Sequence, residues 1–138
     1  MPEPYKRILL KVSGEALATN TADEIIEPEM TDMIATALSA VRLQQPELEI
    51  AIVVGGGNIW RGAPAIAQGM NLTDADHMGM LATIINALSL KDALRQHDLE
   101  PRVMSALPID KVCEPWIPER ARRHLAKKRI VICAAGLG

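Results

Sequence analysis

Three short glycine-containing segments follow apolar runs of the sequence and could bind an anion. They occupy residues 11–14 (KVSG), 53–58 (VVGGGN) and 134–138 (AAGLG). Because glycine has no side chain, its backbone N–H group can turn toward a phosphate group at close range. Each segment by itself fits a simple tight turn about as well. If all three follow strands of one parallel sheet, they meet at one edge, and together they favour a phosphate site.

Two cations, Lys11 and Arg61, accompany these segments and could neutralise a phosphate. Lys11 interrupts the apolar run ILLKVSG, where an unpaired ammonium group would be costly to bury. We therefore favour a functional lysine over one that merely reaches water at the edge of a sheet. The planar guanidinium of Arg61 suits two phosphate oxygens at once, although an ordinary loop arginine also fits this position.

Neither of two common phosphate-binding motifs is present in the sequence. Residues 57–62 have the glycine spacing of a P-loop, but Ala63 and Pro64 stand where lysine and serine or threonine belong. The Rossmann fingerprint requires glycine at the position of Trp60. A different phosphate-binding design is therefore expected.

Asp76 and a set of four cations are further candidates. The Asp76 carboxylate would repel a phosphate but could bind two ribose hydroxyls. From the sequence pattern alone, an acid in the first turn of a helix, where the helix dipole favours it, is the better interpretation. We expect the neighbouring His77 to be structural. The four cations could form a solvated face or an effector site, and both interpretations stay open; they are Lys91, Arg95, Arg102 and Arg129.

The strands that would position these residues are four β-like runs. They lie at Arg7–Val12, Glu49–Val54, 102–105 and 129–134. The second and fourth runs are continuously apolar, as is typical of parallel strands that are covered on both faces.

Helical patterns separate these runs. The first begins at Pro28, the second has Asp74 as its expected N-cap, and the third begins near Pro118. The third ends in cations, which a helix C-terminus favours: Arg122, Arg123, Lys127 and Lys128. The alternation predicts an α/β fold, an open and mostly parallel sheet with helices on both faces.

Composition limits the class of protein. The 138 residues are 49% apolar, which is enough for the core of one domain, and the net charge of −2 gives no reason to expect nucleic acid or an anionic membrane as a partner. Cys113 and Cys133 form no metal-ligand pattern and indicate a reducing compartment. Without an apolar signal core or a long apolar run, we expect a cytoplasmic protein.

The sequence stops just after an apolar strand, at Gly136, Leu137 and Gly138. In an α/β unit, a glycine loop at this place leads into the next helix. We therefore expect residues 1–138 to be one α/β portion at the N-terminus of a longer protein.

Five segments, in this order and spacing, closely resemble bacterial uridylate (UMP) kinases, a branch of the amino-acid kinase fold family. They are KRILLKVSGEAL, VVGGGNIWRG, DHMGMLATIINAL, MSALPIDKVCEP and RIVICAAGLG, and the similarity runs from about Tyr5 to the last residue. The resemblance implies transfer of the γ-phosphoryl group of ATP to UMP, with Mg²⁺, in pyrimidine nucleotide biosynthesis. It also implies a homohexamer, activation by GTP and inhibition by UTP.

The resemblance also assigns roles to individual residues. Lys11 matches the catalytic lysine, and Arg61 and Gly57 match contacts at the phosphoryl-transfer centre. The ATP phosphates would lie against the segment that contains Lys11, Val12, Ser13 and Gly14. The expected UMP contacts are Gly56, Asp76, Leu137 and Gly138.

Two departures from the family pattern matter. Leu137 stands where better-known members carry threonine, so a hydroxyl donor is missing. The part that binds the ATP base, together with a second catalytic residue, an aspartate, would follow residue 138. We therefore expect the 138-residue chain alone to be inactive.

Three other functions remain open. The chain could belong to another kinase of this fold that acts on a carboxylate or carbamate. It could come from a non-catalytic storage or nucleotide-binding protein, or from a regulatory module that binds UMP alone. The presence of Lys11, Arg61 and Asp76 together favours the kinase.

Overall fold

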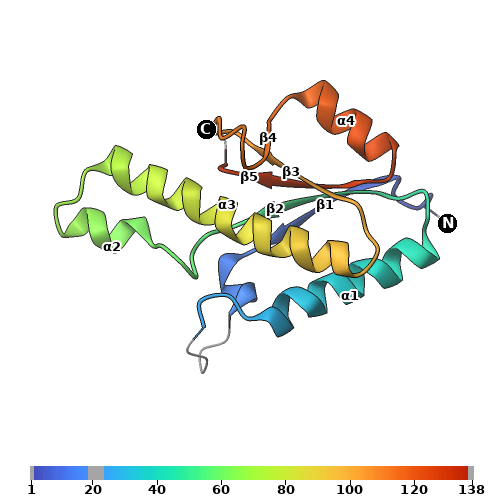
Figure 1. Cartoon of the computed structure of the whole chain (residues 1–138), viewed down its shortest axis with the longest axis horizontal. Helices are drawn as coiled ribbons and strands as arrows, with labels where there is room; N and C mark the ends of the chain where they lie inside the picture. Colours follow the sequence, from blue (N-terminus) through green and yellow to red (C-terminus); the bar gives the residue numbers. More distant parts are fainter. Residues whose placement is uncertain (1, 19–23, 137–138) are drawn as a thin grey trace.

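The computed structural model describes residues 2–18 and 24–136, which form one five-stranded sheet. All of its strand pairs are parallel, and the strand order is β1-β2-β5-β3-β4 (Figure 1). The strands are β1 (Arg7–Val12), β2 (Glu49–Val54), β3 (Pro101–Ser105), β4 (Glu114–Pro115) and β5 (Ile130–Ala134). The sheet therefore has β5 at its centre, and β1, β2 and β5 end side by side, as the glycine segments predict.

Helices cover both faces of the sheet, which confirms the fold class predicted from the sequence (Figure 1). On one face, α1 (Pro28–Gln44) and α3 (Leu72–Gln96) pack on Ile50, Ile52 and Ile132 in the main core. On the other face, α4 (Pro118–Ala126) places Ala121 and Leu125 against Val131. Because β2 and β5 are covered on both sides, their continuous apolar runs are explained.

The start of α3 differs from the prediction. Its N-cap is Asn71, whose side-chain oxygen accepts a hydrogen bond of 3.1 Å from the backbone N–H of Asp74. Asp74 therefore lies in the first turn, and its prediction as N-cap was wrong. Asparagine and aspartate are about equally good N-caps, so residue type alone could not separate the two.

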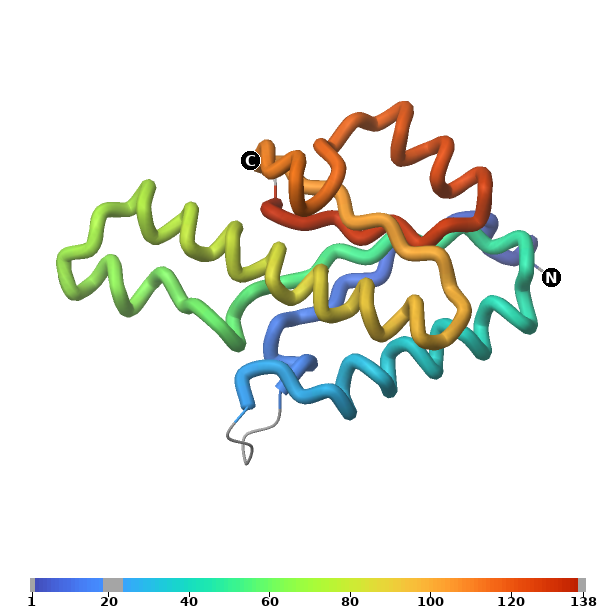
Figure 2. Tube along the Cα trace, viewed as in Figure 1, coloured from blue at the N-terminus to red at the C-terminus, as the bar shows by residue number. Residues whose placement is uncertain are grey.

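Two short helices were not predicted: η1 (Gly14–Leu17) and α2 (Gly62–Ala67). The residues 62–81, which contain α2 and the first part of α3, project beyond the edge where β1, β2 and β5 end (Figure 2). We call residues 62–81 the arm. Across the described ranges, we find no helix with the length and apolar character that crossing a membrane requires.

Candidate functional site

The loops that follow β1 and β2 pack against each other through their backbones. The N–H of Gly55 donates a 2.8 Å hydrogen bond to the carbonyl oxygen of Val12. A Cβ atom on Gly14 would lie 2.5 Å from the backbone nitrogen of Gly57 and 2.6 Å from Oδ1 of Asn58. Since real Cβ atoms essentially never come this close, the glycine at position 14 is needed for loop packing as well as for any ligand. The tight-turn interpretation thus explains part of the pattern.

An acidic side chain that sequence reasoning missed also lies at this loop. The Glu15 carboxylate forms an ion pair with the Arg61 guanidinium, and the two side chains are 52% and 64% exposed. A Cβ atom on Gly57 would lie only 2.6 Å from Oε1 of Glu15. The Glu15 carboxylate therefore already occupies the space over Gly57. Nothing in the sequence around Glu15 indicated its contact with Arg61, because the two residues are 46 positions apart.

A buried amide fixes the β2 loop to α3. Asn86 has no exposed surface, and its Nδ2 donates to Gly55 O and to Asn58 Oδ1, both at 2.7 Å. Nδ2 of Asn58 donates in return to Oδ1 of Asn86 at 3.1 Å and to Ile25 O at 2.9 Å. All four amide hydrogens are thereby used. The only signal in the sequence was an amide side chain within the largely apolar segment ATIINALSL, which also contains Thr83 and Ser89.

The loop after β5 is held by the same helix. The backbone N–H of Ala135 donates to Oγ1 of Thr83 at 2.7 Å, and that hydroxyl donates to Met80 O at 2.6 Å. Ala135 has a left-handed φ of 67°, and Gly136 follows with 58°. The expected UMP contacts Leu137 and Gly138 lie outside the described residues.

The arm brings Asp76 toward the same edge. Nε1 of Trp60 donates to Ala75 O at 3.1 Å, which ties the chain next to Arg61 to the turn that carries Asp76. Gly79 lies one helical turn after Ala75 in α3, and its carbonyl oxygen would be 3.2 Å from a Cβ atom placed on Gly56. Gly56 therefore lies directly on α3, and Asp76 is exposed close by.

Lys11, Val12 and Ser13 form the other side of the edge. Lys11 is exposed and its backbone pairs in register with Val53, whereas its ammonium group has no hydrogen-bond or ion-pair partner among the described residues. Ser13 is exposed, whereas the side chain of Val12 is buried in the core. Only the backbone of Val12 is therefore available to a ligand at this edge.

Three of the four candidate effector cations line one cavity of about 510 Å³. Lys91 and Arg95 come from α3 and Arg102 from β3; Lys111 and Arg120 line the same cavity. Two acids also line it, Asp110 and Glu114.

Arg129 is placed apart from this cavity. Its Nε donates to Oε2 of Glu100 at 3.3 Å, and its Nη1 donates to Nδ1 of the buried His124 at 3.2 Å. Nε2 of His124 in turn donates to Oε2 of Glu114 at 2.7 Å. The excess of positive charge in the cavity suits an anion.

Neither cysteine is an activated thiol. Burial raises the pKa of Cys133, and burial is also the largest cause of the raised pKa of Cys113. Within residues 2–18 and 24–136, no three His, Cys, Asp or Glu side chains lie close enough together to hold a metal ion. These ranges therefore offer no metal centre built from protein ligands alone.

The comparisons with known proteins agree on one family. Residues 6–138 match the amino acid kinase family. The uridylate kinase of Dichelobacter nodosus (strain VCS1703A) is 49% identical over 138 residues, which are 99% of this chain and 56% of that protein. The chain thus spans little more than half the length of this relative.

Two crystal structures of UMP kinases are similar in fold and sequence. The enzyme from Ureaplasma parvum is 34% identical with a TM-score of 0.88, and the match covers 96% of this chain and 57% of that one. The enzyme from Bacillus anthracis is 43% identical with a TM-score of 0.86, and the match covers 97% and 54%.

Proposed function

Since the chain belongs to the amino acid kinase family, we propose that it is part of a kinase that transfers the γ-phosphoryl group of ATP to UMP. The observation that carries the proposal is one edge of the sheet, where the glycine loops after β1 and β2 interlock beside Lys11 and Arg61. We take UMP as the proposed substrate from the names of the similar proteins, two UMP kinases and one uridylate kinase.

The proposed mechanism is electrostatic. Lys11 and Arg61 stabilise the negative charge of the transferred group, and the backbone N–H groups at Gly56 and Gly57 hold the acceptor in line. Asp76 binds the ribose hydroxyls. No general base is needed, because the UMP phosphate is already an anionic nucleophile. We propose that Mg²⁺ enters as part of the substrate Mg-ATP.

Binding experiments test the substrate. We expect UMP to bind the chain at least about tenfold more tightly than uridine in isothermal titration calorimetry, because hydrogen bonds to a charged phosphate are strong. In the whole protein, Mg-ATP with UMP is expected to release ADP, with CMP and AMP as control acceptors. UMP binding without turnover would instead favour a binding-only or storage protein, and turnover with a carboxylate acceptor would favour another kinase of this fold.

We also propose that the cationic cavity is the effector site, with GTP as activator and UTP as inhibitor. Arg102→Ala is expected to weaken binding of GTP about tenfold and to leave UMP binding unchanged, because one guanidinium contact to a phosphate is lost. Arg122→Ala, on the exposed surface of α4, is the matched control. Equal GTP affinity of both variants, measured by calorimetry, would place the effector elsewhere.

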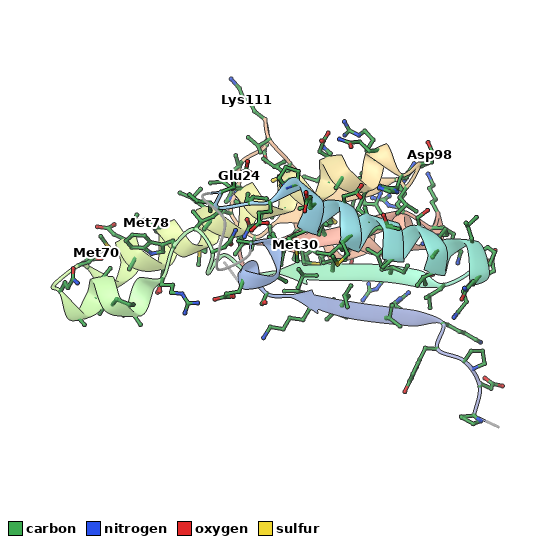
Figure 3. The ribbon with its side chains drawn as sticks, turned by 90° about the horizontal axis from the view of Figure 1, so that it is seen from below. Glu24, Met30, Met70, Met78, Asp98 and Lys111 are labelled. Carbon is green, nitrogen blue, oxygen red and sulfur yellow. The ribbon has the colours of Figure 1, made fainter. Side chains whose placement is uncertain are left out.

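The wider setting is part of the same proposal: a homohexamer in the cytoplasm that serves pyrimidine nucleotide biosynthesis. An apolar stripe on α3 supports self-association. Met78, Leu81 and Ile85 are 40%, 46% and 49% exposed and follow each other at helical spacing. Figure 3 shows Met70 and Met78 on the arm, away from the sheet. The free thiols Cys113 and Cys133 fit a reducing compartment.

A further inference from the structure

A carboxylate of the protein lies between the glycine loop and the arginine of the proposed site. Glu15 lies in the first turn of η1, and its Oε1 accepts a hydrogen bond from Nη2 of Arg61. If Gly57 carried a Cβ atom, that atom would lie 2.6 Å from Oε1 and 3.3 Å from Oε2. Both carboxylate oxygens therefore lie against the glycine loop that is expected to approach the phosphoryl group.

In this contact the Glu15 carboxylate is the anion, and Arg61 is the cation that binds it. Arg61 offers a planar set of donors that suits a carboxylate and a phosphate equally in geometry. The negative charge of Glu15 would repel an incoming phosphate as long as it stays in place.

The Glu15–Arg61 ion pair is weak enough for another anion to replace Glu15. Because both side chains are more than half exposed, water screens their attraction, and such pairs contribute little to stability. Glu15 can turn into solvent without leaving a buried charge behind. A phosphate dianion carries more negative charge than a carboxylate. It can therefore displace the Glu15 carboxylate from the Arg61 guanidinium.

We propose that Glu15 is an internal counter-anion, which holds Arg61 over Gly57 until the phosphate of a substrate displaces it. This inference rests on the proposed function in naming the substrate, but the displacement itself concerns any phosphate group. Glu15 thus sets the affinity for phosphates: it positions Arg61 in the free protein and opposes weakly charged anions.

A purely structural role of Glu15 makes the opposite prediction. If the pair only holds the loops together, removing the carboxylate loosens Arg61 and weakens binding. If Glu15 is a counter-anion, removing its charge frees Arg61 and strengthens binding. The sign of the change in affinity therefore separates the two roles.

The experiment measures binding of inorganic phosphate and of UMP by calorimetry to the whole protein of wild-type sequence and to its Glu15→Gln and Glu15→Ala variants. We expect both variants to bind both ligands about two- to fivefold more tightly, the range that an exposed ion pair allows. The gain should shrink as salt rises from low to physiological concentration, since screening weakens the competing charge. The control is Glu3→Gln, the same change of charge on an exposed residue that precedes β1.

The outcomes separate this inference from the proposed function. Unchanged or weaker binding in both Glu15 variants, with UMP still bound, would overturn the counter-anion and leave the UMP site standing. Tighter binding of phosphate without a preference for UMP would support the counter-anion and remove the proposed substrate. If neither ligand binds any variant, both proposals fail, because freeing Arg61 would have opened no anion site.

Discussion

Replacing Lys11 with methionine is expected to lower UMP-dependent turnover of ATP by a factor of about a hundred or more, the usual effect of removing one group that stabilises transition-state charge. Lys11 stands at the edge where the loops meet and has no partner among the described residues, so its charge is available to a ligand. Methionine keeps most of the unbranched stem and removes only the ammonium group. The measurement is the single-turnover rate of UDP formation in the whole protein.

Stability should not change with this substitution, because surface changes away from special contacts stay within about 0.5 kcal/mol. Lys6→Met is the matched control, since Lys6 is an exposed lysine just before β1, at the other end of this strand. If Lys11→Met kept its rate within about threefold of the wild type, phosphoryl transfer would not depend on this lysine, and the proposed mechanism would be wrong.

Gly14→Ala is expected to lower the free energy of unfolding by about 2–3 kcal/mol, as forced overpacking does. The new methyl group would meet the backbone nitrogen of Gly57 at 2.5 Å and Oδ1 of Asn58 at 2.6 Å. The neighbour is backbone in the first case and an amide locked to Asn86 in the second, so neither can move cheaply. Urea denaturation measures the difference.

The same substitution at Gly79 should have the opposite sign. Gly79 lies inside α3, and a Cβ atom there would have 3.9 Å to its nearest neighbour, on Trp60. Because alanine is the better helix former, Gly79→Ala is expected to raise the free energy of unfolding by about 0.5–1 kcal/mol. Equal effects at positions 14 and 79 would contradict the close packing of the two loops.

Four of the five described strands could be predicted because their signal is local, whereas the two-residue strand β4 (Glu114–Pro115) was not predicted. The bounds Arg7–Val12 and Glu49–Val54 follow from short apolar runs that end at glycine or serine. The helix α2 could not be predicted, because none of its residues is buried and its segment GAPAIA shows no periodic apolar face. The pattern of burial that reveals other helices is absent from this segment.

The residues of the candidate site were proposed from their types and spacing, whereas their contacts could not be predicted. Lys91 and Arg95 stand four residues apart on one helix, so their common face could be foreseen. The pairs Glu15–Arg61 and Asn58–Asn86 join positions 46 and 28 residues apart, and only the fold brings them together. Similarly, Arg129 precedes its strand and turns to Glu100 and His124, which no local pattern indicates.

The central position of β5 has a consequence for how the sheet assembles during synthesis. Among the described strands β5 is translated last, yet it joins β2 to β3. Until residues 130–134 emerge, the nascent chain can form β1 with β2 and β3 with β4, but these two pairs have no strand between them. Pairing of strands that are far apart in the sequence is slow, and the edges of β2 and β3 stay unpaired until β5 is added. Of the described strands, the one that is made last is therefore the one that joins the two halves of the sheet.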